Sequence, residues 1–352
     1  MSSWRADRYQ AAIFGMSGLE LTQNEIAFFK DVQPFGYILF ARNIETASQL
    51  VKLTDQLRII NDNPQTPILI DQEGGRVARL KPPLIVEHPP ARRYGEIYAQ
   101  DKEAGLRACY LGGILLGHAL ATYGVNVNCL PCLDLSFAQT SAVIGDRAYG
   151  ETPKKVAQLG MAAAQGLMET GVLPVMKHMP GHGRGAVDSH LELPVITAKI
   201  EALKKTDFEA FRLCQNLPLG MTGHLKYSKI DPEHTSTVSV KLIQDIIRGF
   251  IGFDGLLMSD DISMQALSGD ITQRGLASLE AGCDLVLHCN GDFQEMTALG
   301  QQLPRLSLQS QQRLAQIIPL FTPAEAPQDV DKLEAEWKEI LSRHFPKPQE
   351  KV

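Results

Sequence analysis

Eight short apolar segments recur along the chain with longer amphipathic stretches between them, and this alternation most strongly restricts the possible folds. The segments are mostly continuous apolar runs, which is typical of strands buried on both faces of a parallel sheet. We predict the eight strands at 10–15, 36–40, 67–71, 125–131, 172–178, 218–224, 255–260 and 283–289. Helical periodicity is present at 46–60, 101–123, 152–170, 198–215, 240–250 and 271–281.

Strands that alternate with helices imply a parallel sheet, and eight of them close a (β/α)8 TIM barrel better than they fit an open doubly wound sheet. No GxGxxG motif follows the first predicted strand, which argues against a dinucleotide-binding fold. The chain has 352 residues, of which 44% are hydrophobic, enough for one barrel with a large core. We therefore expect an α/β protein with a single catalytic domain over 1–352. Residues 290–352 are expected to form a C-terminal extension packed on the barrel, with a charged surface helix at 329–345.

Charge and the N-terminal sequence narrow the class of function. The net charge is −6 without a basic cluster, so we expect no nucleic-acid partner. The N-terminus lacks the apolar core of a secretory signal, and no run reaches the ~18 apolar residues of a membrane span. We expect a cytoplasmic protein, a monomer, without a membrane partner. The six cysteines are expected to be reduced and packed, since the motif Cys129-Leu-Pro-Cys132 has no second CxxC to pair with.

Charged and histidine side chains follow six of the predicted strands at their carboxyl ends, where a TIM barrel places its active site. A purely structural role, such as capping a helix or forming an ion pair at the edge of the barrel, would explain one such residue. It explains poorly why six strands all end in charged or histidine residues. The residues are Arg42, Asp71, Asp134, Lys177, His178, His224, Asp260 and Asp261, with Arg79 and Arg147 in the loops that follow. Carboxylates accept hydrogen bonds from hydroxyls and cations donate to them, so we expect a neutral, hydroxyl-rich ligand such as a sugar. The residues expected to surround it are Asp71, Arg79, Arg147, Lys177 and His178.

The segment KHMPGHGRGAVDSH (177–190) has two interpretations. Its three histidines and Asp188 have the ligand chemistry of a zinc site, which would make the protein a metal-dependent barrel hydrolase. However, the first strand ends without the His-x-His pair typical of such enzymes, and glycines separate the ligands, so we expect no metal and no cofactor. In the second interpretation the glycines let the loop swing, and Asp188 accepts a hydrogen bond from His190 and makes it a better base. His182 is then structural.

A mobile Asp–His pair above a fixed carboxylate is typical of a displacement enzyme, in which the carboxylate is the nucleophile and the histidine gives and takes protons. Asp260 or Asp261 is the candidate nucleophile. Neighbouring residues of a strand face opposite sides, so we expect only one of the two to point into the barrel. The hydrophobic pattern does not choose between them, because Leu257 and Met258 are both apolar.

These motifs resemble the bacterial β-N-acetylhexosaminidases of glycoside hydrolase family 3, of the NagZ type. The matching segments are DQEGGRVARL (71–80), KHMPGHG with DSH (177–190), MSDDISM (258–264), GYILFARNI (36–44), GVNVNCLPCLDL (124–135) and MTGHLKYSKIDP (221–232). The resemblance runs from about Ala11 to Asn290 without large gaps. The chain departs from the family's usual residues, without losing a catalytic group, at Cys129, Cys132, Met179, Arg184-Gly185 and Gly223.

The resemblance implies a retaining hydrolase of terminal β-linked N-acetylglucosamine, with Asp260 as the nucleophile and Asp188 and His190 as the acid/base pair. The resemblance also implies that Asp71, Arg79, Arg147, Lys177 and His178 bind the sugar. The implied substrate is a muropeptide fragment, N-acetylglucosamine linked to anhydro-N-acetylmuramic acid with or without a stem peptide, cleaved in the cytoplasm during peptidoglycan recycling. Since a neutral histidine does not repel an anion, a β-N-acetylglucosaminide phosphorylase is the alternative on the same scaffold.

Overall fold

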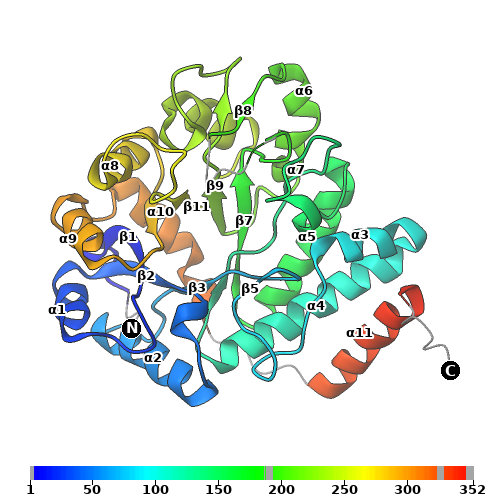
Figure 1. Ribbon diagram of the computed structural model, residues 1–352, viewed down its shortest axis with the longest axis horizontal. Helices are drawn as coiled ribbons and strands as arrows, with labels where there is room; N and C mark the ends of the chain where they lie inside the picture. The colour runs from blue at the N-terminus through cyan, green and yellow to red at the C-terminus, as the bar shows by residue number, and fades with distance from the viewer. Residues whose placement is uncertain (1–3, 186, 188–192, 323–328, 346–352) are drawn as a thin grey trace.

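The structure is a computed structural model, and it describes residues 4–185, 187, 193–322 and 329–345. Eight parallel strands form a closed barrel in the order β1-β2-β3-β6-β7-β9-β11-β12, with β12 paired to β1 (Figure 1). Their bounds are β1 (Gln10–Gly15), β2 (Pro34–Leu39), β3 (Ile68–Ile70), β6 (Val127–Asn128), β7 (Leu173–Met179), β9 (Leu219–Thr222), β11 (Leu256–Asp261) and β12 (Leu285–His288). The prediction of a (β/α)8 barrel is confirmed, and each of the eight predicted segments contains or overlaps one barrel strand.

Helices surround the barrel on the outside (Figure 1). They are α1 (Gln23–Val32), α2 (Ala47–Ile60), α3 (Ala91–Gln100), α4 (Lys102–Thr122), α5 (Pro153–Met168), α6 (Ile200–Lys205), α7 (Asp207–Arg212), a π-helical segment (Leu242–Phe250), α8 (Ile271–Ala281), α9 (Phe293–Gln302), α10 (Leu308–Ile317) and α11 (Val330–His344). The stretch predicted as one helix at 198–215 is two helices. The break lies at Thr206, which leaves the helical conformation (φ −128°, ψ −91°) and whose hydroxyl donates to the Ala202 carbonyl.

Both faces of the barrel strands are buried, as the continuous apolar runs predicted. On β1, Ile13 faces the barrel interior and its neighbour Phe14 packs under the surrounding helices. The interior is closed at the amino end of the strands by Trp4 together with Phe321, and by Leu314 of α10. The open end is therefore the carboxyl end, where the loops that carry the polar residues gather.

Two short strand pairs that the sequence did not predict extend this carboxyl end. Directly after β3, β4 (Gln72–Gly74) and β5 (Val77–Ala78) form an antiparallel pair. Farther round the rim, β8 (Val195–Ile196) and β10 (Lys226–Tyr227) pair in parallel. The β4–β5 pair matters most for the site, because it folds the chain after β3 back toward the barrel mouth.

The C-terminal helices occupy different places on the barrel. α9 follows β12 and packs beside α1 and α8, where it completes the ring of helices. α11 lies away from that ring against α4 (Figure 1), with Trp337 buried and Glu336 paired to Arg107. α4 is long and apolar enough to pass for a membrane span, but 61% of its most apolar window is buried inside the protein.

Candidate active site

A pocket of about 320 Å³ opens at the carboxyl end of the barrel. The polar part of its lining, called here the polar wall, includes Asp71, Arg79, Arg147, Lys177, His178 and Asp260. The apolar part includes Ile38, Phe40, Met221, Met264 and Leu287. The volume lies at the lower end of the roughly 300–1,000 Å³ range of small-molecule sites, which suits one monosaccharide better than an extended chain.

Asp71 follows the last residue of β3 and joins two cations. Its carboxylate accepts hydrogen bonds from Lys177 Nζ at 2.7 Å and from Arg79 Nη2 at 2.9 Å. Burial alone would raise the pKa of Asp71, but Lys177 and Arg79 outweigh it and hold the pKa well below its usual range. Asp71 is therefore ionised at neutral pH, and the structure brings it together with both predicted partners.

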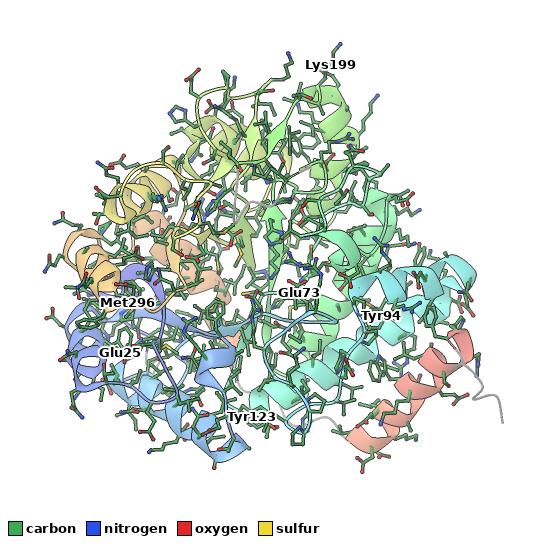
Figure 2. The ribbon with its side chains drawn as sticks, in the orientation of Figure 1. Glu25, Glu73, Tyr94, Tyr123, Lys199 and Met296 are labelled. Atoms are coloured by element: carbon green, nitrogen blue, oxygen red, sulfur yellow. The ribbon has the colours of Figure 1, made fainter. Side chains whose placement is uncertain are left out.

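Glu73 is a site residue that the sequence interpretation did not select. Its carboxylate accepts two hydrogen bonds from Arg147, at 2.7 and 2.8 Å, and contacts Lys177 Nζ at 2.7 Å. The Glu73 side chain is only 4% exposed and lies near the middle of the molecule (Figure 2). Against the effect of burial, the two cations lower its pKa to about 2. Two signals pointed to it: the two-residue spacing from Asp71, and the presence of three cations but one carboxylate among the five residues expected to surround the sugar.

His178 connects the cations to a buried aspartate. Its Nε2 lies 3.3 Å from Arg147 Nη2, and its Nδ1 lies 2.6 Å from Asp134 Oδ2. A guanidinium only donates, so Nε2 accepts and the ring proton resides on Nδ1. Asp134 also accepts the backbone N–H of His182 at 2.5 Å. Burial lowers the pKa of His182 to about 4, so its ring is neutral at physiological pH.

The thiol of Cys132 lies beside this pair, and Cys132, Asp134 and His178 together have the ligand types of a metal site. Cys132 Sγ lies 3.3 Å from Asp134 Oδ2, whereas His178 Nδ1 lies only 2.6 Å from the same oxygen. Zinc bonds of about 2.0–2.2 Å in a tetrahedron separate neighbouring N and O ligands by about 3.3 Å or more. The 2.6 Å separation is that of a hydrogen bond, so we interpret the cluster as a hydrogen-bonded one.

Asp260 and Asp261 both line the pocket, although neighbouring residues of a regular strand face opposite sides. The pairing of β11 with β12 shifts register between Met258 and Asp261, so the strand bulges there and the simple alternation is lost. The two carboxylates nevertheless differ. Asp261 accepts from the Ser263 hydroxyl at 2.6 Å and from the backbone N–H of Cys289 at 3.1 Å. Its acceptor capacity is largely used within the protein.

Asp260 keeps most of its carboxylate available. Among the described residues, the only hydrogen bond to this carboxylate comes from the Asp261 backbone N–H, at 2.8 Å. Burial raises its pKa, but the imidazoles of His224 and His178 and the Asp261 N–H outweigh this effect, and the net pKa is lowered. An ionised carboxylate with free acceptor positions on the pocket wall has the properties of a nucleophile.

The glycine-rich stretch between the two ends of the predicted catalytic segment is packed tightly, not hinge-like. The Thr140 hydroxyl donates to the Gly183 carbonyl at 2.6 Å, and the Tyr227 hydroxyl donates to the Gly181 carbonyl at 2.6 Å. A Cβ on Gly183 would collide with the Leu135 backbone, so glycine is needed there for close approach. The predicted acid/base residues Asp188 and His190 lie outside the described residues.

The six cysteines of the chain are all buried and free. Cys129 belongs to the barrel interior, and Cys132 contacts Asp134 as described above. Burial raises the pKa of both thiols well above the usual range of a cysteine. The CxxC motif is therefore a pair of packed thiols, as its isolation in the sequence predicted.

Comparison with known proteins places these features in context. Residues 13–318 match the model of the glycosyl hydrolase family 3 N-terminal domain. A β-hexosaminidase of Methylobacillus flagellatus is 34% identical over 304 residues, which covers 85% of this chain and 86% of the relative. One of Nitrosomonas eutropha is 38% identical over 279 residues, 78% of this chain and 79% of the relative. The crystal structure of NagZ from Neisseria gonorrhoeae with N-trifluoroacetyl-D-glucosamine superposes with a TM-score of 0.86 at 28% identity, covering 96% of this chain and 99% of that one.

Proposed function

Because the chain belongs to glycoside hydrolase family 3 and is a β-N-acetylhexosaminidase, we propose that it is a retaining enzyme that uses Asp260 as its nucleophile. The proposed substrates are peptidoglycan fragments with a terminal β-linked N-acetylglucosamine on anhydro-N-acetylmuramic acid, with or without a stem peptide. The proposed place of action is the cytoplasm, and the proposed active form is the monomer. The observation that carries the proposal is the ionised carboxylate of Asp260, which lines the pocket beside the proposed sugar-binding groups and, among the described residues, accepts only the Asp261 N–H.

The polar wall supports the sugar assignment. Asp71 is held ionised and can accept from two sugar hydroxyls, while Arg79 and Arg147 keep further N–H groups for donation. His178 and Lys177 are nearly inaccessible, so their positions are fixed before a ligand arrives. Fixed donors and acceptors reduce the ordering cost of binding a polar ligand.

The proposed reaction has two displacements. An Asp260 oxygen attacks the anomeric carbon while the bond to the leaving oxygen breaks, and protonated His190 gives that oxygen its proton. Neutral His190 then removes a proton from water, the water oxygen attacks the anomeric carbon, and the bond to Asp260 breaks. Asp188 is proposed to orient His190. The roles of these two residues rest on the resemblance of the DSH motif.

Trapping with an activated 2-deoxy-2-fluoro glycoside of N-acetylglucosamine configuration tests the nucleophile. The fluorine slows breakdown of the glycosyl–enzyme, and peptide mapping by mass spectrometry then locates the label. We expect the label on Asp260.

Substitution of the nucleophile gives a second test. Asp260→Ala should lose at least about 10³-fold in turnover of an aryl N-acetylglucosaminide. Asp261→Asn is the matched variant and should lose much less activity, because Asp261 bonds to Ser263 and Cys289 instead of facing free space. Label on Asp261, or none at all, would contradict the proposal.

A further inference from the structure

His224 is a buried histidine, two residues after the end of β9, that plays no part in the proposed chemistry. It does not line the pocket, although it contacts the strand end that carries Asp260 and Asp261. Its Nε2 lies 2.9 Å from the Asp261 carbonyl oxygen, and its Nδ1 lies 2.7 Å from Thr237 Oγ1. Both ring nitrogens are thus engaged, so the ring orientation is fixed from both sides.

Two threonine hydroxyls continue the contact from His224 to the backbone of Asp260. Thr237 Oγ1 lies 2.8 Å from Thr222 Oγ1, and Thr222 Oγ1 accepts the backbone N–H of Asp260 at 3.3 Å. All three side chains are fully buried. The series therefore starts at the amide nitrogen of Asp260 and ends at the carbonyl oxygen of Asp261, and it encloses the two carboxylate-bearing residues.

The direction of every proton in this series can be assigned. A carbonyl oxygen only accepts, so His224 Nε2 carries a hydrogen and donates to Asp261. Burial lowers the pKa of His224, so its Nδ1 is unprotonated and accepts a hydrogen bond from the Thr237 hydroxyl. The Thr237 oxygen then accepts the Thr222 hydroxyl, whose own oxygen accepts the Asp260 N–H. Each donor meets one acceptor, so the series is internally satisfied.

The strand end needs such support because it is a bulge. Between Met258 and Asp261 the ladder to β12 loses its regular register. The Leu287 N–H, which lies opposite this bulge, is accepted by the Ser259 hydroxyl at 2.9 Å in place of a backbone carbonyl. A bulge leaves one residue outside the ladder, and here that part of the strand is secured by side chains.

We propose that Thr222, Thr237 and His224 are positioning residues that fix the bulged end of β11 and thereby aim the Asp260 carboxylate at the anomeric carbon. This inference rests on the proposed function of Asp260 as nucleophile. A misplacement of a reacting group by about 1 Å costs on the order of 10²-fold in rate. Loss of the series should therefore slow the attack of Asp260 while leaving sugar binding by Asp71 and Arg147 unchanged.

The rate of trapping by the activated fluoro glycoside measures this attack directly, since an activated leaving group needs little protonation. Thr237→Val keeps the side-chain shape and removes the hydroxyl. We expect its trapping rate constant to fall about 10–100-fold, with the dissociation constant for the reagent within about 3-fold of the wild-type value. His224→Leu should behave in the same way. His224→Gln should recover part of the rate, because its amide can both donate to Asp261 and accept from Thr237.

Thr235→Val is the matched control. Thr235 is buried on the same segment, and its hydroxyl has no hydrogen-bond partner among the residues that the structure describes. Trapping should proceed at the wild-type rate in this variant. Thermal unfolding shows which variants are folded at the assay temperature. If Thr237→Val is not folded, Thr222→Val provides a second test of the same series.

Three outcomes are possible besides the expected one. Equal trapping rates in wild type and folded Thr237→Val, with Asp260 labelled in both, would overturn the inference and leave the proposed function intact. An equal fall in Thr235→Val would also overturn it, since general loosening of the segment would then explain the effect. Label in the wild type on a residue other than Asp260 would overturn the proposed function and the inference with it.

Discussion

Glu73 shows how one carboxylate can hold two cations of the proposed binding site in place without itself lining the pocket. Lys177 and Arg147 are both nearly inaccessible, with side chains 2% and 9% exposed, and each carries a positive charge. Glu73 contacts both at 2.7 Å, whereas Asp71 contacts only Lys177 of the two. Without Glu73, Asp71 would be the one carboxylate described in contact with this pair of cations, and it contacts only Lys177. A buried charge without a partner of opposite charge destabilises a protein.

Glu73→Gln should therefore reduce both stability and sugar binding. The amide can accept from only one cation, and its NH2 group would face the other. We expect the free energy of unfolding to fall by about 3–5 kcal/mol, as for other broken buried ion pairs. KM for an aryl N-acetylglucosaminide should rise more than kcat falls, because Asp260 is not touched. Urea denaturation and steady-state kinetics measure the two effects.

Glu96→Gln is the control for this substitution. Glu96 pairs with Arg93 on the protein surface, where its side chain is 41% exposed. Exposed pairs contribute less than about 1 kcal/mol, so this variant should match the wild type. A Glu73→Gln protein with wild-type stability and wild-type KM would show that Lys177 and Arg147 do not depend on Glu73.

At the residue scale, sequence reasoning predicted the polar wall of the site but not its internal bonding. The structure brings together Asp71, Arg79, Arg147, Lys177 and His178, as expected. Strand ends can be recognised from apolar runs, so the residues that follow them could be named. The pairing of each carboxylate with its cation depends on how the chain folds at the β4–β5 turn. These two strands are too short to produce a periodic pattern in the sequence. Glu73 was missed for this reason.

At the scale of elements, α11 supports the site from a distance. Trp337 is 2% exposed, and its ring centroid lies 4.7 Å from that of His88. The carbonyl of His88 accepts the backbone N–H of Gly75 at 2.8 Å, within the β4–β5 turn next to Glu73. α11 thus braces the segment that delivers Glu73 to the two cations.

Trp337→Ala should destabilise the protein by about 3–5 kcal/mol, because it leaves a large cavity between α11, α4 and His88. Glu336→Ala, one residue earlier on the same helix, removes an ion pair to Arg107 whose side chains are both more than 40% exposed. It should cost less than about 1 kcal/mol. Denaturant midpoints of the two variants measured side by side provide the test. Equal midpoints would mean that α11 contributes by charge and not by burial of Trp337.

Element prediction succeeded for strands and was incomplete for helices. α1, α3, α9 and α10 were not predicted. α1 carried a readable signal, since Thr22 and Glu25 form a capping box. α3 contains Gly95, which intrinsic propensity disfavours inside a helix. Its backbone packs so closely on the Tyr149 carbonyl that a Cβ would collide with it, so tertiary contact explains this residue and local pattern does not.

At the scale of the whole molecule, closure of the barrel was predictable because it follows from the number and order of the strands. The local departures from regular strand geometry were not predictable from the sequence. The bulge in β11 shifts the register of two strands that both read as simple apolar runs, and it brings both Asp260 and Asp261 to the pocket wall. Such a shift depends on the packing of neighbouring strands in the closed barrel, which a single segment does not encode.

The same burial of charge at the barrel mouth predicts how the whole protein responds to acid. The pKa values of Glu73 and Asp134 are both about 2 in the folded protein, below the values of about 4 in an unfolded chain. A depressed carboxyl pKa contributes stability above the unfolded pKa, and this contribution is lost as the pH falls toward the folded pKa. A difference of about two units corresponds to about 2 to 3 kcal/mol for each group at neutral pH.

Buried histidines extend this loss to milder acid. Burial lowers the pKa of His88 to about 3 and that of His182 to about 4, while an unfolded histidine titrates near 6.5. The unfolded chain therefore takes up protons first, and stability falls as the pH drops below about 6.5. Asp207 acts in the opposite direction, because burial raises its pKa. The two histidines and two carboxylates together outweigh Asp207, so the protein loses stability as the pH falls.

We therefore expect the free energy of unfolding, measured in urea, to decline from about pH 6.5 and to fall more steeply below about pH 4.5. His88→Phe keeps a ring against Trp337 and removes one titrating group, so its decline between pH 6.5 and 4.5 should be shallower than in the wild type. His234→Gln is the control, because the His234 side chain is 59% exposed, and it should follow the wild-type curve. A wild-type stability that stays constant from pH 7 to pH 4 would contradict the burial of neutral histidines, and parallel curves for wild type and His88→Phe would exclude His88 as their source.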